Sequence, residues 1–169
     1  MHIAPLSTAH TRALFDAIVE SSGELVPWLG PRYAMSQAQD VEAFVAEWTA
    51  AAANGSYYGF VAMDGDRCLG FGLVNQINAF HRFANVGYWI RTAETGRGYA
   101  TALVRYLAAF AFGELGLERV ELVIEPTNAA SIAVAEKVGA EREGLLRRRL
   151  AGRAGPARDA FMYSLVNDR

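Results

Sequence analysis

A strand, a glycine-containing turn and an amphipathic helix follow one another in the middle of this 169-residue chain. The apolar run 85–91 leads into a turn that contains Gly96 and Gly98, and a helix is predicted to begin near Gly98 because apolar residues recur there with helical spacing. These residues are Leu103, Val104, Leu107, Phe110 and Ala111. This order of elements restricts the chain to folds in which a helix starts directly from a strand end.

The start of such a helix favours an anion, because its first N–H groups are unpaired and the helix dipole is positive there. Glycines let a phosphate approach the backbone, and the guanidinium of Arg97 suits phosphate geometry. A P-loop is excluded, since the only lysine is Lys137, and a dinucleotide fingerprint lacks its third glycine at Thr101. The segment predicts a phosphate site, although two glycines alone also fit an ordinary turn.

The run 96–101 (GRGYAT), after the strand 87–90 (GYWI), resembles the acetyl-CoA-binding motif of the GNAT N-acetyltransferases. Further segments resemble the RimJ/RimL-like branch of that family, whose members acetylate the N-termini of ribosomal proteins: 25–29, 128–131, 136–140, 143–147 and 158–163. The resemblance covers nearly the whole chain. One position departs from the pattern, because Ala93 stands where the family often has Arg or Gln.

The resemblance implies an α/β GNAT fold, with a mixed, mostly antiparallel sheet and a central β-α-β unit that binds acetyl-CoA. Acetyl-CoA would be the co-substrate, and no metal is implied. The residues implied to bind it are Tyr88, Trp89, Ile90, Arg91, Gly96, Arg97, Gly98, Tyr99, Ala100, Thr101, Asn128, Ser131 and Lys137. The strand 88–91 would act through its backbone, with one N–H polarising the acetyl carbonyl.

The resemblance also suggests catalytic side chains. Ser131 is implied to donate a proton to the CoA sulfur, with Asn128 holding the pantetheine arm, although both residue types also cap helices readily. The general base that would accept the proton of the amine is less defined, since Asn85 stands where many relatives have glutamate. His81 and Glu125 are the candidates, while a solvated loop histidine and a water chain are the alternatives.

Length and composition narrow the function classes. We expect one domain over residues 1–169, and a net charge of −2 argues against nucleic acid as a partner. Cys68 is the only cysteine, which suits a reducing compartment, and neither a signal peptide nor a membrane-spanning stretch is expected. The expected location is therefore the cytoplasm. The sequence does not fix the oligomeric state, and a homodimer is compatible with it.

The expected elements fit a mixed α/β sheet better than a doubly wound one. A first helix around 13–18 is predicted to start at Ser7 or Thr8 and to end at Gly23, with 27–28 in a loop. A second helix is predicted from a Ser36–Gln39 capping box to Asn54. The remaining expected elements are strands 56–63, 67–75 and 83–91, a helix ending at Gly116, strand 119–125, helix 128–138, and strands 140–150 and 157–166 around a loop at 152–156.

The sequence thus predicts an acetyl-CoA-dependent N-acetyltransferase for a primary amine, most simply a protein or peptide N-terminus. A small amine, such as an amino acid, a polyamine or a drug, is the nearest alternative acceptor. A non-catalytic acyl-CoA-binding module and a nucleotide-binding oxidoreductase fragment are the others. The aromatic candidates for an acceptor groove are Trp28, Tyr57, Tyr58 and Phe80, and the basic run 147–149 is interpreted as a solvated strand face.

Overall fold

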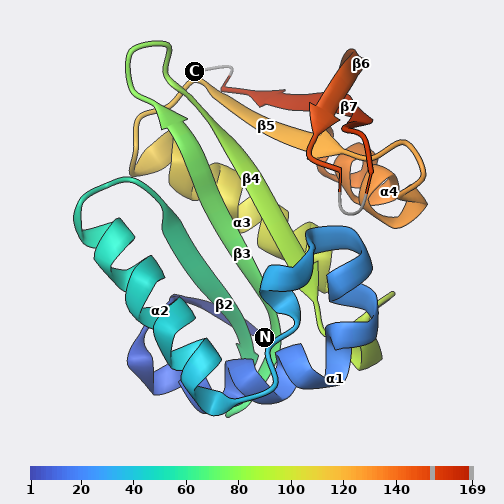
Figure 1. Ribbon diagram of the computed structural model, residues 1–169. Coiled ribbons are helices and arrows are strands. Elements are labelled where there is room, and N and C mark those ends of the chain that lie inside the picture. The colour runs from blue at the N-terminus through green and yellow to red at the C-terminus, as the bar shows by residue number, and fades with distance from the viewer. Residues whose placement is uncertain (153–154, 168–169) are drawn as a thin grey trace.

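The computed structural model describes residues 1–152 and 155–167 of the protein (Figure 1). In chain order, the elements are β1 (His2–Pro5), η1 (Thr8–His10), α1 (Thr11–Leu29), η2 (Pro31–Tyr33), α2 (Ala38–Ala53), β2 (Tyr58–Asp64), β3 (Arg67–Asn78), β4 (Phe83–Ile90), η3 (Thr92–Glu94), α3 (Tyr99–Gly113), β5 (Arg119–Ile124), α4 (Ala129–Val138), β6 (Glu141–Leu150) and β7 (Arg158–Val166). Within the described ranges, no helix combines the length and apolar character that a membrane crossing requires.

The strands form one seven-stranded sheet in the order β1-β2-β3-β4-β5-β7-β6. All described neighbours pair antiparallel except β4 and β5, which run parallel on either side of the α3 connection. The β2–β3 hairpin turns at Gly65, whose φ of +54° is readily adopted by glycine. The predicted antiparallel meander and central β-α-β unit are therefore confirmed.

Helices cover both faces of the sheet, because the side chains of each strand alternate between its faces. In β4, Trp89 packs with residues of α1 and α2, whereas Val86 packs on the opposite face against α3. The α1/α2 layer is rich in aromatic contacts, such as Trp48 edge-on to Phe71 at 5.5 Å between ring centroids. The α3 layer combines aliphatic residues, such as the fully buried Leu103 and Leu107, with ring contacts such as Phe60 to Phe110 at 4.9 Å between centroids.

The first helix is longer than predicted. Instead of ending at Gly23, α1 continues through Pro27 to Leu29. The next residue, Gly30, has a φ of +93°, and its N–H donates to the Val26 carbonyl at 3.0 Å. Glycine weakens a helix interior and proline removes one helical hydrogen bond, but the last turns bury Leu25 in the core. Tertiary packing therefore outweighs both local stop signals, and residues 27–28 are helical.

Other boundaries differ by smaller amounts. The start of α2 is capped by the Asp40 carboxylate, which accepts from the N–H groups of Ser36 and Gln37, so the Ser36–Gln39 capping box was misplaced by one residue. Helix α3 ends at Gly113, before Gly116, and the edge strand β1 was not predicted. The predicted loop 152–156 lies partly outside the described residues.

The parallel contact between β4 and β5 is short. Only residues 83–85 of β4 pair with residues 119–121 of β5. Beyond this contact the two strands diverge, as Figure 1 shows for β4 and the orange β5. Helices α3 and α4 flank the gap, so the divergence positions a site next to the start of α3.

Candidate active site

A cavity of about 550 Å³ lies where β4 and β5 separate. Residues 86–90 of β4, residues 122–125 at the end of β5, the start of α3 with the turn before it, and the facing side of α4 line most of it, and Leu150 of β6 and Arg158 of β7 also line it. The last turns of α1 close a further side. The cavity therefore joins the predicted phosphate turn to a wall from the N-terminal part of the chain.

The turn before α3, residues 92–98, is called the glycine turn below. Gly96 and Gly98 have φ values of +76° and +84°, and Gly98 is the N-cap of α3. A Cβ at Gly98 would meet no atom within 4 Å, so the space above the turn is open. The N–H groups of residues 99–101 have no partner within the helix by its geometry. This open, electropositive helix start fits a phosphate group.

Tyr88 supplies a second observation that fits a bound ligand. Its side chain packs on the α3 side of β4 and lines the cavity. The buried phenol oxygen makes no hydrogen bond within the described part of the chain. Burial raises the pKa of this phenol, and the Ser131 side chain partly offsets the rise. A buried hydroxyl beside a cavity can be satisfied by a polar group of a ligand.

Ser131 and Asn128 meet at the start of α4. The Asn128 Oδ1 accepts a hydrogen bond from the Ser131 N–H at 3.0 Å, so Asn128 does cap the helix. This bond uses the Ser131 backbone and leaves its hydroxyl for the cavity, which both residues line. The capping role and the predicted ligand role are therefore compatible. Lys137, at the other end of α4, also lines the cavity.

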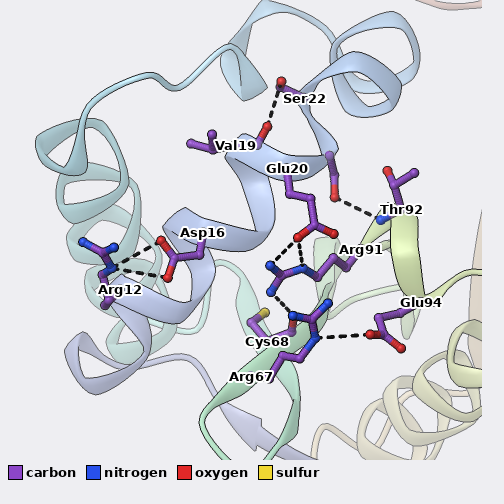
Figure 2. Close-up of polar contacts among 11 residues, drawn as sticks. Arg12, Asp16, Val19, Glu20, Ser22, Arg67, Cys68, Arg91, Thr92 and Glu94 are labelled. Atoms are coloured by element: carbon purple, nitrogen blue, oxygen red, sulfur yellow. Dashed lines mark hydrogen bonds and ion pairs between the residues drawn. The ribbon is translucent and has the colours of Figure 1, made fainter.

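Two predicted cofactor-binding arginines lie outside the cavity lining. Arg97 is 60% exposed and pairs with Glu94 at 3.0 Å. Arg91 turns to the other side of the sheet, where its guanidinium contacts Glu20 of α1 (Figure 2). Its backbone N–H donates to the Leu69 carbonyl. Trp89 lines the cavity although its side chain packs in the α1/α2 layer, consistent with the predicted use of the strand backbone.

The remaining predicted residues at the turn lie along the cavity. Gly96, Gly98, Tyr99, Ala100 and Thr101 all line it, as do Tyr88 and Ile90. The structure thus brings the glycine turn, the β4 edge and the start of α4 together around one space.

The candidate bases differ in their placement. His81 lies in the β3–β4 turn, where its N–H donates to Asn78 Oδ1 at 2.8 Å, and it does not line the cavity. The cavity-lining part of β4 begins at Val86, several residues along an extended strand, so the structure does not bring His81 to the site. Asn85 donates to Asn75 Oδ1 at 2.8 Å within the sheet.

Glu125 does line the cavity, but its carboxylate is paired with the Arg158 guanidinium. The Glu125 side chain is 18% exposed, so both partners are largely shielded from water. The Glu125 carboxylate is therefore already engaged by a guanidinium.

The α1 wall was missed by the sequence reasoning apart from Trp28. It consists of Glu24, Leu25, Trp28 and Leu29, which recur with helical spacing. The expected helix end at Gly23 hid this periodicity. Of the other aromatic candidates, Tyr57 packs at a tilt against Trp48, Tyr58 packs on Phe110, and Phe80 is 87% exposed.

Helix α1 is fastened to the glycine turn beside the cavity. The Ser21 hydroxyl accepts from the Thr92 N–H at 3.0 Å, one turn of helix before Leu25. Figure 2 shows the Glu20–Arg91 pair next to this bond, with Arg67 reaching Glu94 of the glycine turn at 3.2 Å. These contacts hold the α1 wall and the glycine turn together.

Comparison with known proteins shows to which family this fold and cavity belong. The model of the Acetyltransferase (GNAT) domain family matches residues 1–141. The putative ribosomal N-acetyltransferase YdaF of Bacillus subtilis is 33% identical over 156 residues, which cover 90% of this chain and 84% of that protein. Four further curated relatives match over 50–58% of their own length.

Solved structures agree with the family match. A putative ribosomal-protein-serine acetyltransferase from Vibrio cholerae is similar with a TM-score of 0.83 and 27% identity, covering 99% of this chain and 95% of that one. Mycobacterium smegmatis RimJ, solved in complex with CoA-disulfide, is similar with a TM-score of 0.87 and 25% identity, covering 98% and 81%. With its α/β fold and its cavity at the diverging strands, the chain belongs to the GNAT family of N-acetyltransferases, enzymes that transfer acetyl groups.

Proposed function

We propose that this enzyme acetylates the N-terminal α-amine of a protein or peptide, by direct attack of the amine on acetyl-CoA in a ternary complex. The observation that carries the proposal is the single cavity that joins the glycine turn to the α1 wall. One end suits the phosphates and pantetheine arm of the co-substrate, and the other end is open and partly apolar. The names of YdaF and of the Vibrio cholerae neighbour support a ribosomal-protein acceptor, which would place the reaction in the cytoplasm.

The chain's own residues would hold acetyl-CoA at two places, the start of α3 and the free edge of β4. The N–H groups at the start of α3 face the open space above Gly98 and would bind the pyrophosphate. Residues 86–90 of β4 have no β5 partner, so their backbone is available for the amides of the pantetheine arm. One N–H of this edge would stabilise negative charge developing on the acetyl oxygen, an effect worth about 3 kcal/mol in related chemistry.

Ser131 would donate a proton to the departing sulfur. A free thiol has a pKa near 8.5, so the thiolate already leaves readily and the donor adds a moderate acceleration. An α-amine has a pKa of about 8, so a useful fraction is neutral at physiological pH and its proton can pass to water. The Glu125–Arg158 pair would shape this part of the cavity electrostatically instead of serving as the base.

The test is release of free thiol from acetyl-CoA against short peptides with different N-termini and a set of small amines. Turnover on peptides, with mass spectrometry placing the acetyl group on the α-nitrogen, is the expected result. Turnover confined to small amines would overturn the proposed acceptor class. Binding of CoA with no turnover on any amine, even at alkaline pH, would show that this chain is a binding module.

A further inference from the structure

Three glutamates line the cavity, and they differ in their partners. Glu94 pairs with Arg67 at 3.2 Å and with Arg97 at 3.0 Å. Glu125 pairs with Arg158. By contrast, no hydrogen bond or ion pair joins Glu24 to any residue in the described ranges 1–152 and 155–167. Glu24 is therefore the cavity-lining carboxylate whose charge has no protein counter-ion among the described residues.

The position of Glu24 is fixed by its helix. Ser21, three residues earlier on the same face of α1, accepts from the Thr92 N–H of the glycine turn. Glu24 consequently lies beside the end of β4, one helical turn further along. It is exposed and yet lines the cavity, so it stands where the cavity opens to solvent.

The surroundings of Glu24 have a distinct chemical character. Trp28 follows at i+4 and Leu29 at i+5, and these side chains are 37% and 43% exposed at the same cavity. A carboxylate next to exposed apolar surface matches a ligand that presents a cation beside an apolar group. A peptide N-terminus with an apolar first or second side chain is such a ligand, since its α-amine is mostly protonated at neutral pH.

Building on the proposed function, we propose that Glu24 binds the ammonium group of the incoming acceptor at the cavity mouth, before the amine loses its proton to water and attacks acetyl-CoA. Trp28 and Leu29 contact the acceptor's first side chains. Glu24 then acts as a specificity-determining residue, and its effect falls on the binding of the acceptor. Acetyl-CoA is held by the glycine turn and β4, so its affinity does not depend on Glu24.

The experiment is calorimetric binding of a short peptide to the enzyme loaded with CoA, which carries no acetyl group and so permits no turnover. The peptide has leucine at its second position and is used with a free or an acetylated N-terminus. We expect Glu24→Gln to weaken binding of the free-amine peptide about tenfold, between the effects of an exposed ion pair and a shielded charged hydrogen bond. Binding of the acetylated peptide should not change.

Glu42→Gln is the matched control, because Glu42 is an exposed helical glutamate of α2 that does not line the cavity. Glu42→Gln should change the affinity for neither the free-amine peptide nor the acetylated peptide. Unchanged CoA affinity in both variants shows that they are folded. In turnover assays, Glu24→Gln should raise the KM of the acceptor about tenfold with little change in kcat. Added salt should reduce the difference in acceptor KM between the variant and the wild type, because it screens the charge of Glu24.

The results separate this inference from the proposed function. Equal loss of binding for the free and acetylated peptides, no loss for either, or no binding of the free-amine peptide to the wild type would each overturn the role of Glu24. If Glu24→Gln weakens only the free-amine peptide while that peptide is never acetylated, the inference stands and the proposed acceptor fails. If peptides are acetylated with an unchanged KM in Glu24→Gln, the proposed function stands and the inference fails.

Discussion

The Arg91 guanidinium donates two hydrogen bonds to one carboxylate oxygen of Glu20, from Nε at 2.8 Å and from Nη2 at 2.5 Å. Arg91 is only 7% exposed, and its Nη1 also donates to the Cys68 carbonyl at 3.3 Å (Figure 2). Since Glu20 belongs to α1 and Arg91 follows β4 directly, the pair connects the α1 wall to the end of the strand that would hold acetyl-CoA. The two walls of the cavity are thereby fixed relative to each other.

Replacing Glu20 by Gln should destabilise the protein by about 1–2 kcal/mol, because a largely buried guanidinium loses its counter-charge. The KM of acetyl-CoA should rise as the glycine turn loosens. Chemical denaturation and steady-state kinetics measure these effects. Asp16→Asn is the control, since its partner Arg12 is 82% exposed and such surface pairs contribute little. Equal destabilisation by the two variants would contradict the connecting role.

The same pair predicts a pH dependence of stability. The hydrogen bond from Arg91 holds the pKa of Glu20 below its usual value. A carboxyl whose pKa is lowered by folding contributes stability above its unfolded pKa of about 4.3 and loses that contribution as the pH falls through the folded value. The stability difference between wild type and Glu20→Gln should therefore shrink below about pH 4. A difference that stays constant down to pH 3 would exclude this linkage.

At Gly98, aspartate and asparagine substitutions separate charge from conformation. Asparagine tolerates positive φ better than most residues, and a Cβ at Gly98 meets no protein atom, so both variants should fold. Aspartate places a negative charge at the helix start and should weaken CoA binding at least tenfold more than asparagine does. Calorimetry with CoA measures both affinities. Equal affinities in the two variants would show that no phosphate of CoA binds at this turn.

For Ser131, alanine should lower kcat about tenfold to hundredfold and leave the affinity for acetyl-CoA and the stability nearly unchanged. The cap is preserved because Asn128 bonds to the backbone N–H of residue 131. Asn128→Ala should behave differently, with a stability loss of about 1 kcal/mol and weaker acetyl-CoA binding. Wild-type turnover in Ser131→Ala would eliminate the proton-donor role.

Tyr88→Phe should affect the stability of the free protein and its affinity for acetyl-CoA differently. Removing a buried hydroxyl that has no hydrogen bond within the described chain should leave the free protein as stable as before, or slightly more stable. If that hydroxyl pairs with the co-substrate, the affinity for acetyl-CoA should fall several-fold. Thermal unfolding with and without CoA gives both values. Tyr106→Phe, at a partly exposed position of α3 that does not line the cavity, is the control, and equal effects of CoA in the two variants would refute the contact.

Histidine 81 provides a negative prediction. Because His81 lies in the β3–β4 turn and outside the cavity lining, His81→Gln should leave the acidic limb of the pH–rate profile unmoved. The measurement is kcat/KM from pH 5.5 to 9 for both proteins. A shifted limb would show that this histidine reaches the acceptor amine.

The sequence predicted the central part of the fold well because its local signals agree with the tertiary structure. Gly98 stands at a helix start and needs positive φ, and Asn128 and Gly139 mark both ends of α4. The prediction failed where packing outweighs local preference, as at Gly23 and Pro27 inside α1. It also missed β1, since a four-residue edge strand depends on β2 to form.

The candidate site divides in the same way. The glycine turn and residues 128–131 are contiguous motifs, and the sequence order alone shows them. The α1 wall is a long-range feature, because Glu24 approaches the glycine turn only through contacts such as Ser21 with Thr92, 71 residues apart in the chain. The pairing of Glu125 with Arg158, 33 residues further along the chain, is likewise a product of the folded arrangement.

The three paired residues that join β4 to β5 have a mechanical consequence. The sheet behaves as two smaller sheets, one of four strands and one of three, that meet along a short seam. An extended ligand lying in the gap would lengthen that seam by hydrogen bonding to both edges, so the substrate would serve as a structural strand between the two halves. Loading with acetyl-CoA should then raise the unfolding temperature and slow amide hydrogen exchange along both edges. Release of the product would lower the unfolding temperature and speed the exchange again.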